Sequence, residues 1–335
     1  MNEEHNVTLQ QHNMVSRIKK KAFELGFAAC GIASVHPLSD DAAYLKQWLS
    51  EGHQGDMTYL ERYADQRENI SLLVSNAKSV IVVLYSYQQE QQQPDDAPRL
   101  AKYTFGDDYH YVIKTKLQLL LQFIQQEIAP AEGRAFCDTA PVFERRWAQQ
   151  AGLGWIGTNK CLIHPKWGSF FLIGELVIDL ELEHDIPMEG DCGNCGLCVS
   201  ACPTQALTLS GVFHAERCIS YLTIESKEPD IDDVYKPFLS QYVAGCDICQ
   251  DVCPWNRGVH LPANDLKQHD PLWNLRREDW QLMTTSAYKK WTKKSALNRI
   301  SFQRMRRNLR AVGIQPFQQN GDENSTSNPL PDPVS

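Results

Sequence analysis

The sequence has no long hydrophobic run, since nothing in its 335 residues approaches the roughly 20 consecutive apolar residues of a membrane-spanning helix. Its first residues, MNEEHNVTLQQHNMVSRIKKKAFELGF, include early acidic residues and neither an apolar export segment nor a twin-arginine pair. Basic charge is also in short supply, because 33 lysines and arginines face 41 acidic residues and leave a net charge of -8. These absences exclude a membrane-spanning helix, predict a cytoplasmic protein, and argue against one that coats nucleic acid indiscriminately.

A chain of this length exceeds the usual single domain, so we expect two domains or one domain with a large insertion. Apolar residues recur at helical spacing near residues 15–25, 43–49 and 111–128. The run SVIVVLYSY at 79–87 is typical of a buried strand, and 169–182 is also rich in strand-forming residues. This alternation predicts a mixed α/β fold built on a mixed sheet.

The predicted domain organisation has four parts. Residues 1–185 form an α/β domain, and 186–260 form a small ferredoxin-like unit that has too few large apolar residues to fold without metal. Residues 261–315 form a short helical segment with a basic face, and 316–335 have the composition of a disordered tail.

Cysteine is concentrated in one region, where eight of the eleven cysteines lie between Cys192 and Cys253. In a reducing compartment such clustered cysteines indicate metal ligands rather than disulfides. The first four follow the spacing C-x2-C-x2-C-x3-C with a proline next, which is the bacterial ferredoxin pattern for a 4Fe-4S cluster. They are Cys192, Cys195, Cys198 and Cys202.

A second set of four cysteines must then complete two clusters, because the fourth cysteine of such a run ligates the other cluster. The sequence supplies Cys218 and the string GCDICQDVCP with its three cysteines. We therefore expect one cluster on Cys192, Cys195, Cys198 and Cys253. The other is expected on Cys202, Cys218, Cys246 and Cys249.

The alternative to two iron–sulfur clusters is a pair of structural zinc sites, which also use four cysteines each. Zinc sites do not require the three-then-one spacing with a proline after the last cysteine, so the clusters are favoured. The other three cysteines, Cys30, Cys137 and Cys161, are expected to be small buried hydrophobes.

Asp138 lies where a strand is expected to end and a helix to begin, near Thr139 to Pro141. On the residues alone, the favoured interpretation is that its side chain caps the helix. The nearby glycines of GLGWIG indicate close backbone approach to a flat or phosphate-bearing group, although they do not match the dinucleotide-binding or P-loop spacing.

Four unusual strings occur in order along the chain: KYTFGDDYH (102–110), CDTAPVFERRWAQQAGLGWIG (137–157), CISYLTIE (218–225) and GCDICQDVCPWN (245–256). Together with both cysteine motifs, they resemble the epoxyqueuosine reductase family from about residue 15 to residue 312. Members of that family are cobalamin-dependent enzymes with two clusters that complete queuosine on the tRNA wobble base. The resemblance implies an oxidoreductase that reduces epoxyqueuosine to queuosine in tRNA.

The resemblance further implies that the α/β domain holds cobalamin with its lower axial position free of a strong ligand. Electrons from an external low-potential donor would pass through both clusters to the cobalt. Asp138 matches the family's proton donor, a role that suits a reaction consuming two electrons and two protons. We expect burial or an apolar neighbour to raise its pKa, since an ordinary aspartate is ionised at neutral pH.

Six further residues match family positions that are expected to border cobalamin or the tRNA base. They are Arg62, Tyr103, Asn159, Ser169, Ser220 and Asp247. For each of them the alternative is a surface or packing role.

The chain departs from the family pattern at Lys102 and Thr158, where arginine and lysine are usual, and lacks the helical repeats that many members append. The stretch 289–310 carries nine lysines and arginines and no acidic residue. It is expected to contact tRNA phosphates in place of those repeats, although a solvated helix face would have the same composition.

Two other functions share parts of this pattern. A reductive dehalogenase-like enzyme also combines cobalamin with two clusters, but such proteins usually carry a twin-arginine export signal. A ferredoxin-type carrier needs only the clusters, and some 185 residues ahead of them would then be unexplained. The favoured interpretation is a monomeric enzyme that acts on the anticodon loop of tRNA.

Overall fold

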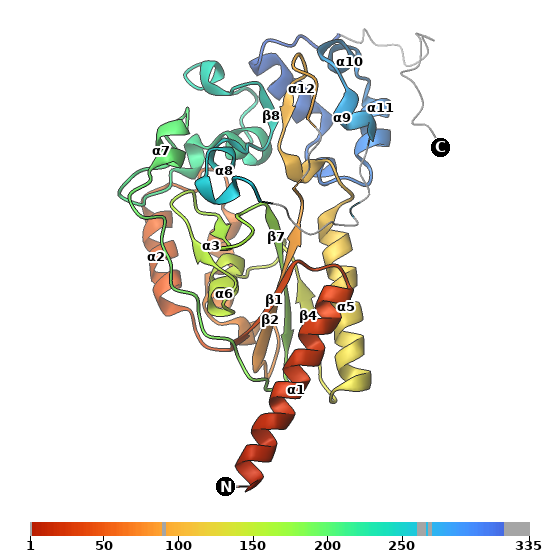
Figure 1. Ribbon diagram of the computed structural model, residues 1–335. Helices are drawn as coiled ribbons and strands as arrows, with labels where there is room; N and C mark the ends of the chain where they lie inside the picture. Colours follow the sequence, from red (N-terminus) through yellow and green to blue (C-terminus); the bar gives the residue numbers. More distant parts are fainter. Residues whose placement is uncertain (1, 89–91, 260–265, 267–269, 318–335) are drawn as a thin grey trace.

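A four-stranded antiparallel sheet forms the centre of the lower part of the protein as drawn in Figure 1. The structure is a computed structural model, and it describes residues 2–88, 92–259, 266 and 270–317. The strand order is β1-β2-β7-β4, and all three pairings are antiparallel. Every residue of β2 is buried, as its β-branched sequence predicts. The strands are β1 (Ala29–Ser34), β2 (Ser79–Ser86), β4 (Gly133–Phe136) and β7 (Phe171–Ile178).

Helices cover both faces of this sheet, because successive strand residues point to opposite sides. In β2, Ile81 and Val83 pack beneath α1 (Asn2–Glu24) and α5 (Tyr109–Glu127). Val82 instead faces the side that α6 covers. That helix spans Glu144–Gln150, and the shorter elements of this part are α2 (Ser39–Ser50), α3 (Tyr59–Arg62), α4 (Ala64–Glu68), η1 (Ile70–Leu72), β5 (Trp155–Ile156) and β6 (Leu162–Ile163).

A second core contains side chains from the second half of the chain and from one segment of the first half. Strand β3 (Arg99–Leu100) pairs in parallel with β8 (Tyr242–Ala244), and Phe105 stacks on Trp273 with ring centroids 3.5 Å apart. This core also holds apolar residues of the C-terminal helices. The remaining elements are η2 (Lys102–Thr104), α7 (Leu197–Ala201), η3 (Ala215–Arg217), η4 (Tyr221–Glu225), η5 (Lys236–Phe238), α8 (Ile248–Asp251), η6 (Pro254–Asn256), α9 (Asp270–Asn274), α10 (Arg277–Leu282), α11 (Thr285–Thr292), η7 (Ala296–Arg299) and α12 (Phe302–Ala311).

The mixed α/β architecture predicted from the sequence is confirmed. In the described residues no sheet mixes parallel and antiparallel pairings, because the four-stranded sheet is antiparallel throughout and the parallel pairing lies in the small β3–β8 sheet. None of the helices in the described part of the chain has the length and apolar character that a membrane crossing requires.

The division into four domains stays a prediction. Pro316 is buried and the N–H of Phe317 donates to the Gln281 carbonyl, so the first two residues of the predicted tail pack on the fold. The rest of that tail lies outside the described residues.

Candidate active site and cluster ligands

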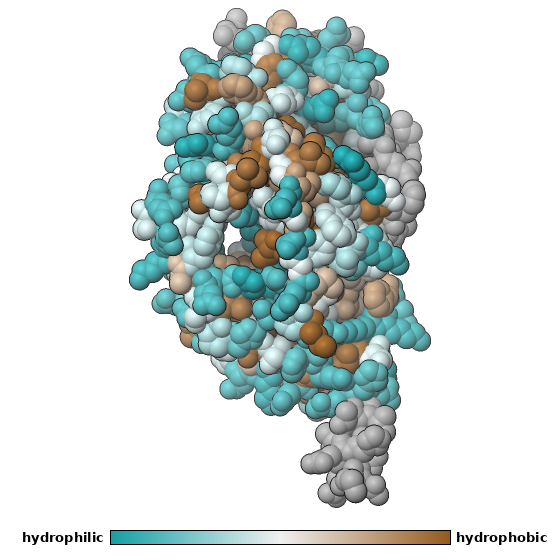
Figure 2. All heavy atoms as spheres, turned by 60° about the vertical axis from the view of Figure 1, so that its left-hand side comes forward, coloured by the Kyte–Doolittle hydropathy of each residue, from teal (hydrophilic) through white to brown (hydrophobic). Residues whose placement is uncertain are grey.

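A cavity of about 330 Å³ lies where the α/β part meets the second core. Its apolar lining includes Met57, Ile224, Leu297 and Ile300. The face that Figure 2 brings forward is hollowed between the upper and lower parts of the molecule, with apolar side chains gathered above the hollow. The polar residues that line the cavity are Tyr103, Thr104, Tyr109, His110, Asp138, Cys218, Ser220, Tyr221, Glu225 and Arg299.

Asp138 follows β4 in a left-handed conformation with φ of 58°, and its side chain is 41% exposed toward this cavity. The helix expected to begin near Thr139 begins instead at Glu144, so the interpretation of Asp138 as a helix cap is wrong. Its Oδ2 accepts a hydrogen bond from the Tyr109 hydroxyl at 3.0 Å and lies 2.9 Å from Nε2 of His110.

His110 lies between two carboxylates. Its Nδ1 is 2.7 Å from Oδ1 of Asp108, and its Nε2 faces Asp138. Burial alone would lower the pKa of His110, but the two carboxylates outweigh burial and raise its pKa to about 9. Both ring nitrogens therefore donate, and His110 is an imidazolium at neutral pH.

The charge on Asp138 differs from the sequence-based expectation. Burial acts to raise its pKa, but His110, the Tyr109 hydroxyl and the Arg299 guanidinium together lower it below the ordinary value. The nearest guanidinium nitrogen of Arg299 is 3.8 Å from Oδ2. The expectation of a raised pKa is wrong because it considered burial and omitted these partners, so at rest the proton belongs to His110 rather than to Asp138.

Two tyrosines beside Asp138 stay protonated. Burial and the neighbouring Asp138 charge raise the pKa of both Tyr103 and Tyr109 well above the ordinary value. Sequence reasoning selected Tyr103 but missed Tyr109, His110 and Arg299. Tyr109 and His110 lie in the family-like string KYTFGDDYH, which could have indicated them, whereas Arg299 is one of nine basic residues in the stretch 289–310 and nothing in the sequence distinguishes it.

One wall of the cavity is held by hydrogen bonds between distant segments. The Tyr221 hydroxyl donates to Oδ2 of Asp56 at 2.9 Å and accepts the Asp56 N–H at 2.8 Å. Gly55 has φ of 56°, and a Cβ atom there would lie 2.3 Å from this hydroxyl. Only glycine therefore lets the two segments approach so closely.

The eight cysteines of the predicted cluster ligands fall into two groups. The thiols of each group lie close enough to act on one another electrostatically. The first group is Cys192, Cys195, Cys198 and Cys253. The second group is Cys202, Cys218, Cys246 and Cys249. These are the sets expected from the ferredoxin spacing, while ligation itself stays a prediction.

Backbone N–H groups point at several of these sulfur atoms. The N–H of Ala206 donates to Sγ of Cys202 at 3.3 Å, and Cys246 accepts the N–H of Ile248. Such donors stabilise the thiolate form that binds a cluster. No cysteine of the chain forms a disulfide. The surroundings of the two groups therefore suit iron–sulfur clusters.

Cys161 has a different environment from the one expected. Cys30 and Cys137 are buried, as predicted, but Cys161 is only half-buried; its thiol donates to the Asn159 carbonyl at 3.8 Å, and the neighbouring Cys249 thiol lowers its pKa. The Asn159 side chain accepts the Cys161 N–H at 3.2 Å and donates to the Cys249 carbonyl at 3.4 Å. Cys161 thus lies beside the second group rather than in a core.

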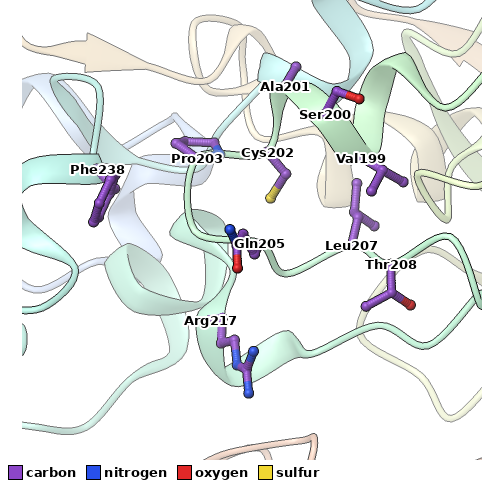
Figure 3. Close-up of a pocket in the computed structure, with 10 residues that line it drawn as sticks. All are labelled: Val199, Ser200, Ala201, Cys202, Pro203, Gln205, Leu207, Thr208, Arg217 and Phe238. Atoms are coloured by element: carbon purple, nitrogen blue, oxygen red, sulfur yellow. The ribbon is translucent and has the colours of Figure 1, made fainter.

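A second cavity, of about 750 Å³, opens beside α7. Figure 3 shows the Cys202 sulfur pointing toward the side that Gln205 and Leu207 line, with Arg217 below. Of the eight predicted cluster ligands, only Cys202 lines this cavity. The cavity therefore does not enclose either group of four cysteines.

The structure brings some of the other predicted contact residues to the first cavity and places others elsewhere. Tyr103 and Ser220 line it. Arg62 is exposed at the end of α3, whereas Asp247 is buried and accepts the Lys102 N–H at 2.8 Å. Ser169 is buried and accepts hydrogen bonds from Gln250 and Asn256, while Asn159 joins Cys161 to Cys249. Cofactor contacts by these residues stay predictions.

The chain is similar to curated proteins over most of its length. It is 43% identical to an epoxyqueuosine reductase of Cellulophaga algicola over 293 residues, which cover 87% of this chain and 95% of that protein. It is 42% identical to that of Cyclobacterium marinum, over 91% of this chain and 98% of the relative. The chain belongs to the epoxyqueuosine reductase family.

Family models and solved structures agree with this assignment to the epoxyqueuosine reductases. The model described as epoxyqueuosine reductase QueG, DUF1730, matches residues 67–139, and the 4Fe-4S double cluster binding domain matches 191–256. The structure of epoxyqueuosine reductase from Streptococcus thermophilus is 27% identical with a TM-score of 0.81, over 90% of this chain and 80% of that one.

A further similar structure is of an epoxyqueuosine reductase with a tRNA-Tyr epoxyqueuosine-modified tRNA stem loop. It is 25% identical to this chain with a TM-score of 0.78, and the match covers 90% of this chain and 81% of that one.

Proposed function

We propose that this protein reduces epoxyqueuosine to queuosine in tRNA, using cobalamin and two 4Fe-4S clusters. The observation that carries the proposal is that Asp138, its His110 partner and the predicted cluster ligand Cys218 line one cavity. A proton source and an electron source therefore meet at the same place. The membership of the chain in the epoxyqueuosine reductase family supplies the substrate class.

The proton chemistry follows from the charges around Asp138. Converting an epoxide to an alkene takes two electrons and two protons and releases water. The His110 imidazolium holds a proton 2.9 Å from Asp138, and Asp138 faces the cavity. Asp138 delivers this proton to the departing oxygen, and the neutral Tyr109 hydroxyl holds the carboxylate in place.

The residues that line the cavity could hold the apolar face of cobalamin. The apolar lining matches a flat corrin face, and Tyr103 and Ser220 offer hydroxyl groups. Among the described lining residues His110 is the one imidazole, and both of its nitrogens face carboxylates, so its role there is to hold a proton. Bound there, cobalamin supplies the electron density that opens the epoxide.

The positions of the cysteines support an order for electron transfer. Cys218, of the second group, lines the cavity, whereas Cys195, of the first group, is exposed. A cluster held by Cys192, Cys195, Cys198 and Cys253 would therefore be the one that an external low-potential donor can reach. A cluster held by the other four cysteines would supply single electrons beside the cavity.

The exposed lysines of the basic stretch suit the tRNA backbone. Lys289, Lys293 and Lys294 are exposed on α11 and the turn that follows it. That turn leads into η7, which ends at Arg299 in the cavity lining. Contacts between these lysines and tRNA phosphates would place the anticodon loop at the cavity. Arg307 takes no part, because it is buried and donates to the carbonyls of Leu222 and Ser226.

The test is an anaerobic reaction of the cluster-loaded protein with tRNA that carries epoxyqueuosine, scored by nucleoside mass spectrometry with and without cobalamin. Queuosine formed only with cobalamin supports the proposal. Turnover of organohalides without action on tRNA would favour the dehalogenase-like alternative, and clusters without cobalamin affinity would favour an electron carrier.

Localisation in the cytoplasm and a monomeric state belong to the same proposal.

A further inference from the structure

Three potential metal ligands from distant parts of the sequence meet beside the wall of the cavity. His53 follows α2, whereas His214 and Glu216 lie just before the predicted cluster ligand Cys218. One ligand atom from each of the three side chains lies within 4.8 Å of the others. Ala215, between the last two, lines the cavity, but none of the three does, so they lie behind its wall.

The polar atoms of this group are not satisfied by the protein. Nδ1 of His214 and Oε2 of Glu216 are buried and have no hydrogen-bond partner among the described residues. Nδ1 of His214 is 3.3 Å from the other oxygen, Oε1 of Glu216, in an orientation that makes no hydrogen bond. The Arg217 guanidinium faces that Oε1 at 3.4 Å and leaves Oε2 unpartnered. Buried polar atoms without a partner require an explanation, and an ion between them supplies one.

The two imidazoles are packed against each other and largely shielded from solvent. Their ring centroids are 4.4 Å apart, and the His53 and His214 side chains are 16% and 19% exposed. Nε2 of His53 is 3.1 Å from Oε2 of Glu51. A carboxylate beside one ring nitrogen orients a metal-binding imidazole and makes it a stronger ligand. Glu51 therefore occupies the position of such an outer partner and leaves Nδ1 of His53 for the ion.

Hydrogen bonds hold the two segments together without a metal. The N–H of Glu216 donates to the His53 carbonyl at 3.3 Å. The Trp48 indole, on α2, donates to the Phe213 carbonyl at 2.6 Å. Because these bonds already place the ligand-bearing segments, an ion would bind with little further ordering of the chain.

The donor set selects the kind of metal. Two imidazole nitrogens and one carboxylate oxygen suit zinc, whereas magnesium and calcium prefer oxygen ligands alone. Tetrahedral bonds of about 2.1 Å place zinc ligands roughly 3.4 Å apart, so small side-chain rotations are enough to close the site. The Glu216 side chain is 31% exposed, so water can reach the fourth position.

We propose that His53, His214 and Glu216 bind one zinc ion, with water as the fourth ligand. The ion joins the loop after α2 to the segment that leads into Cys218, and it stabilises the cavity wall next to that cysteine. A metal that binds only the folded arrangement of these segments stabilises the fold. The inference goes beyond the proposed function, because zinc binding here does not depend on the reaction in the cavity.

The test uses the full-length protein with both clusters loaded, titrated anaerobically with zinc chloride against a zinc indicator. Zinc X-ray absorption then identifies the ligands, since nitrogen and oxygen lie at about 2.0–2.1 Å and sulfur at about 2.3 Å. This measurement separates the proposed site from zinc that has entered the cysteine groups. Iron content and circular dichroism verify that each variant folds.

The variants are His53→Gln and His214→Gln, with Glu51→Gln for the outer partner. His164→Gln is the matched control, because His164 is also half-buried and its ring stacks on Trp167 at 4.6 Å. This control loses a packed imidazole but no ligand of the proposed site.

The wild-type protein and His164→Gln should each bind one zinc ion with nitrogen and oxygen ligands and no loss of iron. His53→Gln and His214→Gln should bind zinc at least roughly 100-fold more weakly, and Glu51→Gln roughly tenfold more weakly, as for loss of an outer partner. Zinc should raise the Tm of the wild-type protein and of the control, but not that of the two histidine variants.

Three results would overturn the zinc site. The first is a wild-type protein with full clusters that binds no zinc. The second is zinc with sulfur ligands, which would place the ion in the cysteine groups. The third is zinc binding by both histidine variants that equals that of His164→Gln, which would leave the two rings with a packing role alone. None of these measurements uses tRNA, so failure of the zinc site and failure of the proposed function are distinguishable.

Discussion

Nε2 of His110 lies 2.9 Å from Oδ2 of Asp138, and the opposite nitrogen of the same ring lies 2.7 Å from Asp108. The imidazole is therefore a cation held between two carboxylates, and the catalytic aspartate of the proposed function is an anion at rest. In this charge arrangement His110 holds the proton, and Asp138 transfers it to the substrate.

Replacing His110 with glutamine should remove that store. Glutamine can still donate to one carboxylate but holds no transferable proton at pH 7, so we expect queuosine formation to slow by roughly 100-fold. Single-turnover assays at pH 7 measure this. His12→Gln is the control, because His12 is exposed on α1 beside Glu183. Equal rates for the two variants would show that His110 only packs against the cavity.

The cluster assignment predicts iron contents. The wild-type protein should hold about eight iron atoms, and Cys253→Ala or Cys218→Ala should each leave about four, with the spectrum of the other cluster intact. Cys161→Ala should keep about eight, because Cys161 contacts Cys249 without belonging to either predicted set. Iron analysis and electron paramagnetic resonance of the reduced proteins measure this. Loss of iron from Cys161→Ala equal to that from Cys218→Ala would contradict the assignment.

The exposed lysines near the cavity should act on tRNA binding rather than on chemistry. A triple change of Lys289, Lys293 and Lys294 to alanine should raise KM and leave kcat nearly unchanged. It should also reduce the slope of log affinity against log salt by roughly two, since each contact to single-stranded phosphate contributes about 0.7. The control is the triple variant of Lys20, Lys46 and Lys78, exposed lysines of the α/β part. The same salt slope for both would refute the phosphate-contacting role.

Protein stability should depend on pH through Glu144. Its pKa is raised from 4.5 to about 8 on folding, so the folded state binds more protons than the unfolded state between these values. The stabilisation is complete below pH 4.5 and is lost as pH rises through about 8. Glu144→Gln should therefore lose less Tm than the wild-type protein between pH 5 and pH 8.5. Thermal unfolding of both proteins across this range measures it, and parallel curves would contradict the raised pKa.

The sequence predicts what depends on local spacing. The eight clustered cysteines and their two sets follow from short intervals, and β2 follows from an unbroken β-branched run. It does not predict the charge of Asp138, because that depends on His110, 28 residues away, and on Arg299, brought in by the second core. Nor does it predict that Glu175 is buried without a partner, since a glutamate in a strand is usually directed to solvent.

The boundary of α6 illustrates the same limit. Thr139 and Pro141 carry the residue types of a helix start, yet the helix begins at Glu144. The three residues after Asp138 instead form a bend, in which the Thr139 N–H donates to the Cys137 carbonyl at 2.6 Å. This bend frees the Asp138 side chain from capping and turns it toward the cavity.

The most direct test of the central claim is an anaerobic reaction of the cluster- and cobalamin-loaded protein with epoxyqueuosine tRNA and a strong one-electron reductant, compared with Asp138→Asn. We expect the wild-type protein to form one queuosine for every two electrons consumed, and the variant to retain both cofactors but react at least about 100-fold more slowly. No queuosine from the fully loaded wild-type protein, or full activity in Asp138→Asn, would contradict the account.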